Sequence, residues 1–152
     1  MNFWLVKSEP DSFSLEDLQS RPNATEMWDG VRNYQARNNL KSMKQGDQVF
    51  FYHSSCKVPA IVGIAEVVRE HYLDPTASNP DHSGFDPKHS EEKPKWYAVD
   101  VQFKQAFKSP ITLSWIKQQK ELQDISLISK GSRLSVMPID AKHWEYIVAR
   151  AR

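Results

Sequence analysis

The chain of 152 residues is long enough for one domain with its own hydrophobic core. Its 20 basic and 19 acidic side chains leave a net charge of +1, which argues against a protein that coats nucleic acid through phosphate contacts alone. No apolar run approaches the ~18 residues of a membrane-spanning helix, no signal peptide opens the chain, and the single cysteine cannot form an internal disulfide. We therefore expect a protein of a reducing compartment, cytoplasmic or, in a eukaryote, nuclear.

The first elements are a buried strand and a short helix. Residues 3–6 are apolar and predict a strand, which Pro10 prevents from continuing. Ser14 and Asp17 have the spacing of a capping box, so we expect a helix to begin after Ser14. Pro22 ends this helix within two turns.

Residues 28–38 combine two aromatic rings, two guanidinium groups and three side-chain amides around one glycine. Planar rings beside planar hydrogen-bonding groups suit a flat, polar, partly anionic ligand, and a nucleobase is the obvious candidate. Trp28 or Tyr34 taken alone is explained equally well as an ordinary core aromatic at a helix start. The segment as a whole predicts a binding site.

A helix is predicted from Asn33, which can cap it, to about Met43. Ala36, Leu40 and Met43 recur at helical spacing and form its buried stripe. We expect Gly46 to end the helix as its C-terminal cap.

Basic side chains gather on the same segment. No acidic residue lies between Gly30 and Gly46, and the four basic residues there are Arg32, Arg37, Lys41 and Lys44. The last three repeat at helical spacing beside the buried stripe. A solvated basic face would be unremarkable alone, but next to Trp28 it indicates one wall of a cleft.

Strand patterns occupy much of the remaining chain. Residues 48–53 and 60–68 are rich in Val, Ile and aromatic side chains, and the first run is apolar on both faces, as in a central strand. A last strand is predicted over residues 132–136, which Pro138 stops, and Asp140 then caps a terminal helix.

Between these strands, residues 69–95 form a polar segment with four prolines and no sustained period. Such a segment predicts a lid, a binding loop or disorder. Its His and Asp residues match no known metal-ligand spacing. Residues 96–104 then alternate as a strand with Trp96 on the polar face, where the ring is either a binding ring or covered by the loop.

Four motifs resemble the EVE domain family of the PUA-like superfamily, namely residues 4–10, 28–38, 51–54 and 133–136. They span nearly the whole chain in the family's order. The resemblance implies a single domain of the α+β class, with a mixed, strongly bent β-barrel flanked by short helices.

The resemblance also implies a binding module that reads a modified cytosine or methylated adenine in DNA or RNA, like the aromatic cages of the related YTH domains. Trp28 and Trp96 would be cage walls. The full set of base-binding candidates is Lys7, Ser8, Trp28, Val31, Asn33, Tyr34, His53, Ser54, Trp96, Arg133 and Ser135. The phosphate-binding candidates are Arg32, Arg37, Lys41 and Lys44. We expect a monomer without cofactor or metal, which in bacteria accompanies a restriction nuclease or other defence protein.

The alternative is an enzyme that acts on a modified nucleotide or nucleic acid, because ASCH relatives within the PUA-like group include hydrolases. Against it, no spaced carboxylate pair or nucleophile–base signature is present, and the neighbours His53 and Cys56 lie in no known catalytic motif. Glu9 is the one acid we would nominate. A sensor of free small molecules is a third hypothesis.

Overall fold

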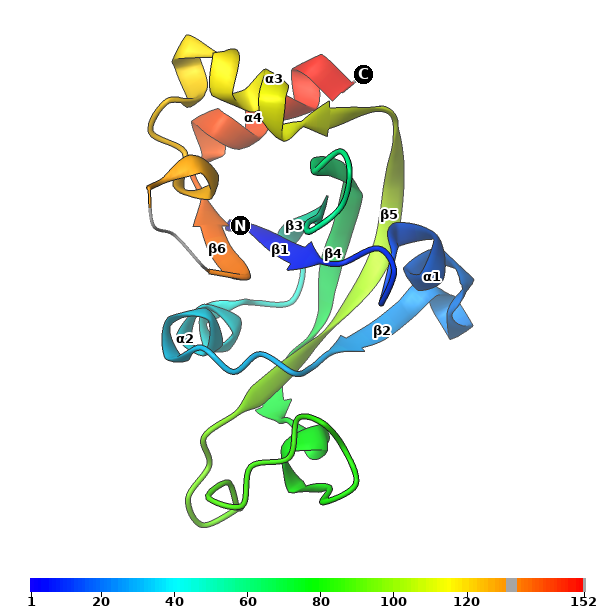
Figure 1. The fold of residues 1–152 in the computed structure, drawn as a ribbon, viewed down its shortest axis with the longest axis vertical. Helices are drawn as coiled ribbons and strands as arrows, with labels where there is room; N and C mark the ends of the chain where they lie inside the picture. Colours follow the sequence, from blue (N-terminus) through cyan, green and yellow to red (C-terminus); the bar gives the residue numbers. More distant parts are fainter. Residues whose placement is uncertain (131–133, 152) are drawn as a thin grey trace.

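The structure, a computed structural model, describes residues 1–130 and 134–151 and has the expected α+β class (Figure 1). Its described strands form one mixed sheet in the order β2-β5-β4-β3-β1-β6. The strands are β1 (Phe3–Ser8), β2 (Thr25–Trp28), β3 (Gln48–His53), β4 (Ala60–Leu73), β5 (Tyr97–Thr112) and β6 (Val136–Ile139). The α-helices are α1 (Leu15–Ser20), α2 (Tyr34–Ser42), α3 (Leu113–Gln118) and α4 (Ala141–Ala151). None of these helices is long and apolar enough to cross a membrane.

The sheet is bent by its two long strands. β4 and β5 run the length of the molecule, with α3 and α4 at one end and the 74–96 segment at the other (Figure 1). Their antiparallel pairing shifts register at four places, and such bulges bend and twist a sheet. β1 pairs in parallel with β3 and antiparallel with β6.

Alternation along β3 builds a core on each face of the sheet, as expected for a central strand. Val49 and Phe51 pack into one core with α1 and α2. Phe50 and Tyr52 pack into the other core with α3 and α4. All four side chains are buried, so the sheet is covered on both faces here.

The predicted helix starts are confirmed. Ser14 and Asp17 form a reciprocal capping box at α1. The Asn33 side chain accepts the backbone N–H of Ala36 at 2.9 Å and caps α2. The predicted end of α2 near Met43 is confirmed, since the helix ends at Ser42 and Met43 is its C-cap. The prediction that Gly46 caps the helix is wrong, because Gly46 lies in the following turn with a φ of +94°.

The strand predictions need several corrections. β5 was predicted over residues 96–104 but continues to Thr112. β2 was not predicted, because four residues are too few to show a period. β4 continues to Leu73, well beyond the predicted end at residue 68. The extension was missed because this part of the strand is polar and lacks the apolar pattern of the first part. The last strand, β6, covers Val136–Ile139 rather than residues 132–136, so Pro138 lies inside it and does not stop it. This is possible because β6 is an edge strand whose outer side needs no ladder donor.

The segment between β4 and β5 is ordered by a short 3₁₀ helix (Pro75–Ser78) and successive turns. Its first residue, Asp74, and Ala77 are both fully buried. His89 is also buried and accepts the backbone N–H groups of Lys95 and Trp96 at 3.0 and 3.1 Å. The segment therefore has a small packed interior of its own.

Candidate functional site

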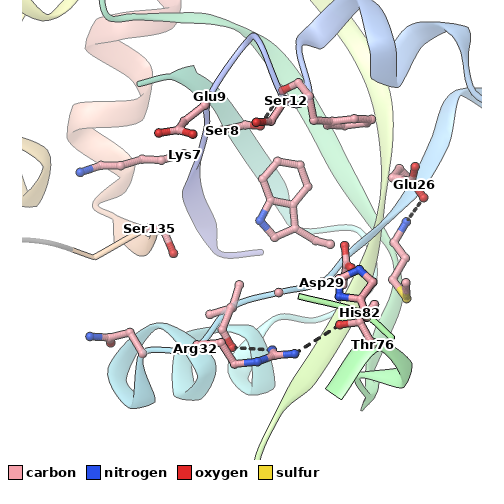
Figure 2. A pocket seen from close by; sticks show the side chains of 16 residues that line it. Lys7, Ser8, Glu9, Ser12, Glu26, Asp29, Arg32, Thr76, His82 and Ser135 are labelled. Carbon is pink, nitrogen blue, oxygen red and sulfur yellow. Dashed lines mark hydrogen bonds between the residues drawn. The ribbon is translucent and has the colours of Figure 1, made fainter. Parts of the chain in front are cut away.

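A cavity of about 740 Å³ opens where the ends of β1 and β2 meet the loop before α2 (Figure 2). This volume lies within the range of small-ligand pockets, roughly 300–1,000 Å³. The lining residues are Lys7, Ser8, Glu9, Ser12, Phe13, Glu26, Met27, Trp28, Asp29, Gly30, Val31, Arg32, Asn33, Thr76, His82 and Ser135. Of the predicted base-binding residues, six therefore meet at one cavity: Lys7, Ser8, Trp28, Val31, Asn33 and Ser135.

Trp28 is both a core residue and a lining residue of this cavity. As the last residue of β2 it packs edge-on against Phe51, with ring centroids 5.5 Å apart and an interplanar angle of 87°. Phe13 meets the same indole at 6.2 Å and 75°. Only 8% of Trp28 is exposed, so the ring is held firmly and presents a fixed apolar surface to the cavity.

The loop between β2 and α2 is fastened to the 74–96 segment by the buried carboxylate of Asp74. One Asp74 oxygen accepts the backbone N–H of Gly30 at 2.9 Å and Nη1 of Arg32 at 3.0 Å. The other accepts the backbone N–H and the hydroxyl of Thr76 at 2.8 and 2.6 Å. Burial works to raise the pKa of Asp74, but the hydrogen bonds from Thr76, Gly30 and Arg32 hold this pKa below its usual value.

Arg32 acts as a clamp in the cavity wall, and the prediction that it binds phosphate is not supported. Besides its ion pair with Asp74, Arg32 donates to the Gly84 carbonyl at 2.7 Å and to the Thr76 hydroxyl at 3.2 Å. A further Nη1 bond goes to the Val31 carbonyl. The guanidinium is occupied because the buried Asp74 carboxylate requires a cation.

Polar side chains, both charged and hydroxyl-bearing, line the cavity on two opposite sides. Figure 2 shows Lys7 and Glu9, from the end of β1, on one side and Arg32 and Thr76 on the other. Burial lowers the pKa of the Lys7 ammonium. For the Asp29 carboxyl, burial and the nearby Asp74 charge raise the pKa. The cavity therefore offers both hydrogen-bond donors and acceptors beside apolar lining residues such as Trp28 and Phe13.

His53 and Ser54 were predicted to contact a base, but neither lines the cavity. His53 Nε2 accepts the backbone N–H of Leu15 at 3.1 Å, at the first turn of α1. Burial lowers the pKa of His53, which favours the neutral ring that this acceptor role needs. The Ser54 backbone N–H donates to the Ser8 carbonyl at 2.9 Å. Both residues therefore brace the site from outside.

The expectation that the indoles of Trp28 and Trp96 face one hollow is wrong at Trp96. Trp96 is 5% exposed, does not line the cavity, and donates its indole N–H to Asp86 at 2.7 Å. Tyr34 covers it as a stacked ring, with centroids 5.1 Å apart and an interplanar angle of 17°. Tyr34 likewise lies outside the cavity, and Arg133 lies outside the described residues.

The predicted basic stripe lies on the surface and not inside the cavity, and only Arg37 and Lys41 are on α2, because the helix ends before Lys44. Lys41 and Lys44 are exposed. Arg37 is half-buried, donates to the Lys95 carbonyl at 3.0 Å and lies with its guanidinium carbon 4.9 Å from the Tyr34 ring centroid. The stripe is therefore a surface feature next to the cavity.

Sequence reasoning missed several lining residues. Phe13 and Asp29 line the cavity, although neither was among the predicted site residues. Thr76 and His82 come from the proline-rich segment, far away in sequence. The prediction that this segment is a binding loop was the only signal for them.

The chain resembles known proteins along almost its full length. The profile of the EVE domain family matches residues 2–150. Thymocyte nuclear protein 1 of Danio rerio is 42% identical over an alignment of 163 residues, gaps included, which covers 96% of this chain and 70% of that protein.

Solved structures agree with this resemblance. The crystal structure of protein PSPTO5229 from Pseudomonas syringae has a TM-score of 0.93 at 51% identity and covers 99% of both chains. The structure of human THYN1 protein in complex with DNA containing 5-methylcytosine has a TM-score of 0.95 at 38% identity, covering 100% of this chain and 98% of that chain. An ASCH protein from Zymomonas mobilis, at a TM-score of 0.59 and 11% identity, shares the fold alone.

Proposed function

Because this chain belongs to the EVE domain family, we propose that its cavity binds a modified cytosine that has been turned out of a DNA strand. The observation that carries the proposal is the open cavity of about 740 Å³ with the firmly packed Trp28 in its lining. The human relative that was solved with 5-methylcytosine-containing DNA has the same fold over this whole chain, which supports cytosine in DNA as the first choice. Methylated adenine and RNA are the alternatives.

The energetics favour a preformed aromatic surface. A base must leave the duplex before its edge can be read, which costs a few kcal/mol. Stacking on an aromatic side chain returns about 1–3 kcal/mol per base. Since Phe13 and Phe51 already hold the Trp28 indole, little side-chain entropy is lost when a base packs against it.

Hydrogen bonds to the base edge supply selectivity for cytosine. Its exocyclic N4 amine is a donor that a carboxylate accepts. Asp29 lies in the cavity wall directly after Trp28, so we assign the cytosine amine to Asp29. A methyl group on the base adds apolar area, and each buried carbon of this kind is worth about 0.8 kcal/mol. The apolar rings of Phe13 and Trp28 are where that group would be covered.

Contacts to the phosphate backbone of the DNA are assigned to residues outside the cavity. We assign flanking phosphates to two exposed lysines, Lys41 on α2 and Lys44 just after it, with Arg37 at the edge of the same stripe. Phosphate contacts position a strand without reading its sequence. With a net charge of +1, affinity for unmodified nucleic acid should be modest.

The test is a binding screen by fluorescence anisotropy. Matched single- and double-stranded oligonucleotides carry one cytosine, 5-methylcytosine, 5-hydroxymethylcytosine, adenine or N6-methyladenine, as DNA and as RNA. We expect preference for a modified cytosine in DNA, which Trp28→Ala abolishes. The control is Trp115→Ala, since Trp115 is a partly exposed tryptophan packed against the other core.

Equal affinity for modified and plain oligonucleotides would refute the proposal. Digestion of the oligonucleotides after incubation, followed by mass spectrometry of the nucleosides, tests the enzyme alternative in the same samples. Chemical conversion of the modified base would show that the protein is an enzyme rather than a binding module.

A further inference from the structure

The ring of Tyr34 is exposed although the structure holds it rigidly. It is 54% exposed at the start of α2, whereas the ring beneath it, Trp96, is 5% exposed. The two rings are nearly parallel, with centroids 5.1 Å apart. Trp96 is itself fixed by its hydrogen bond to Asp86 at 2.7 Å. One face of a two-ring stack is thus anchored in the protein while the outer ring remains open to solvent.

This stack adjoins the cavity without entering it. Asn33, the residue before Tyr34, lines the cavity. Arg32 also lines it, and its guanidinium carbon lies 5.3 Å from the Trp96 ring centroid. Arg32 and Asn33 therefore form a wall that has the cavity on one side and the Tyr34–Trp96 stack next to it.

Cations surround the exposed ring. The guanidinium of Arg37 lies over the Tyr34 ring, with its carbon 4.9 Å from the centroid, and Nζ of Lys95 lies 5.8 Å from the same centroid. A base that stacks on Tyr34 therefore displaces Arg37 from the ring, and the released guanidinium is then available to a phosphate. Lys41 lies on the same helix and Lys44 just after its end, and no acidic residue lies between Gly30 and Gly46. An exposed aromatic face beside several cations matches a nucleic-acid strand, which has bases to stack and phosphates to neutralise.

We propose that Tyr34 is a second stacking site, outside the cavity, for a base that flanks the extruded one. This inference rests on the proposed function, because it needs a strand whose modified base occupies the cavity. When a base leaves the stack, its neighbour loses a partner, and the Tyr34 ring replaces part of that contact. Stacking of this kind is tolerant of sequence because every base has a π-face. Tyr34 therefore adds affinity for the strand, whereas the cavity supplies selectivity for the modification.

The experiment compares three variants on the full chain, with thermal unfolding to verify folding. Tyr34→Ala removes the ring, Tyr34→Leu still covers Trp96 without offering a π-face, and Tyr34→Phe is the control that keeps the ring. On oligonucleotides with one 5-methylcytosine, we expect the Ala and Leu variants to bind about 5- to 150-fold more weakly and the Phe variant to bind within about twofold of wild type.

A set of abasic oligonucleotides identifies the partner of the ring. The base is removed, one position at a time, at each of the two nucleotides on either side of the 5-methylcytosine. At one position we expect base removal to weaken wild-type binding by the same factor as Tyr34→Ala and to have no further effect in that variant. If every abasic strand loses affinity equally in wild type and Tyr34→Ala, the ring touches only the backbone and the inference is overturned.

A third measurement separates this inference from the proposed function. Tyr34→Ala should leave the binding of free 5-methyl-2′-deoxycytidine unchanged, because one nucleoside has no flanking base. If wild type shows no preference for modified strands, the proposed function fails. If that preference is intact but the Tyr34 variants bind like wild type, only the second stacking site fails.

Discussion

Asp74→Asn should detach one wall of the cavity. The wild-type carboxylate is fully buried and accepts four hydrogen bonds, two on each oxygen, from Gly30, Arg32 and Thr76. The amide retains one acceptor oxygen and turns its NH₂ toward groups that are themselves donors. Arg32 also loses its anionic partner.

The expected loss of stability is about 3 kcal/mol. Removing one partner of a buried ion pair typically costs 3–5 kcal/mol. The lower end applies because the Arg32 side chain is 25% exposed and keeps its bonds to Gly84 and Val31. For a chain of this size, such a loss lowers the melting temperature by roughly 6–12 °C. The assay is equilibrium unfolding in urea, and the control is Asp81→Asn, an exposed aspartate of the same segment.

The pH dependence gives a second check on the same residue. Because the folded pKa of Asp74 is depressed, its contribution to stability is complete above the unfolded value of about 4 and is lost as the pH falls below it. The stability gap between wild type and Asp74→Asn should therefore narrow in acid. If Asp74→Asn and Asp81→Asn are equally stable at pH 7, Asp74 does not fasten the cavity loop and the reasoning is wrong.

Three further predictions concern packing, the base edge and the phosphate contacts. Gly63→Ala should destabilise the fold by at least about 1–3 kcal/mol in urea unfolding, because the added Cβ would collide with the Gln105 carbonyl oxygen of the paired strand. An alanine variant as stable as wild type would contradict this packing. Asp29→Asn should be at least as stable as wild type at pH 7, since burial of the carboxyl raises its pKa and ionisation of the carboxyl therefore opposes folding. Fluorescence anisotropy should nevertheless detect weaker binding of oligonucleotides with a modified cytosine, and unaltered binding would exclude Asp29 from the site. Lys41→Gln should weaken the binding of all oligonucleotides about equally and reduce the slope of log Kd against log salt concentration by about 1. The control, Lys117→Gln on α3, should change neither. Equal slopes for the two variants would exclude Lys41 from the phosphate contacts.

Local rules explain which parts of the fold could be predicted. The caps at Ser14 and Asn33 depend on side chains within three residues, so their spacing was sufficient. The two-faced burial of β3 followed from an unbroken apolar run. By contrast, β2 and the outer half of β4 are defined by their pairing with β5, which no local period records.

The same distinction applies to the candidate site. Residues at the ends of β1 and β2, such as Lys7 and Trp28, were located because strand ends and aromatic clusters leave a local signal. Trp96 was misplaced because its cover comes from Tyr34, 62 positions earlier, and from Asp86 in the proline-rich segment. The role of Arg32 likewise depends on Asp74, whose burial no pattern in the sequence indicates.

The indole N–H resonances in an ¹⁵N-HSQC titration with an oligonucleotide that carries one 5-methylcytosine test the central claim most directly. The chain has five tryptophans, and single Trp→Phe variants assign their signals. We predict that Trp28 shifts most, while the buried Trp4, bonded to Asp47, and Trp144 in the other core stay in place. If the modified strand binds and the Trp28 signal does not move, or moves equally with plain cytosine, the cavity is not where the modified base is recognised.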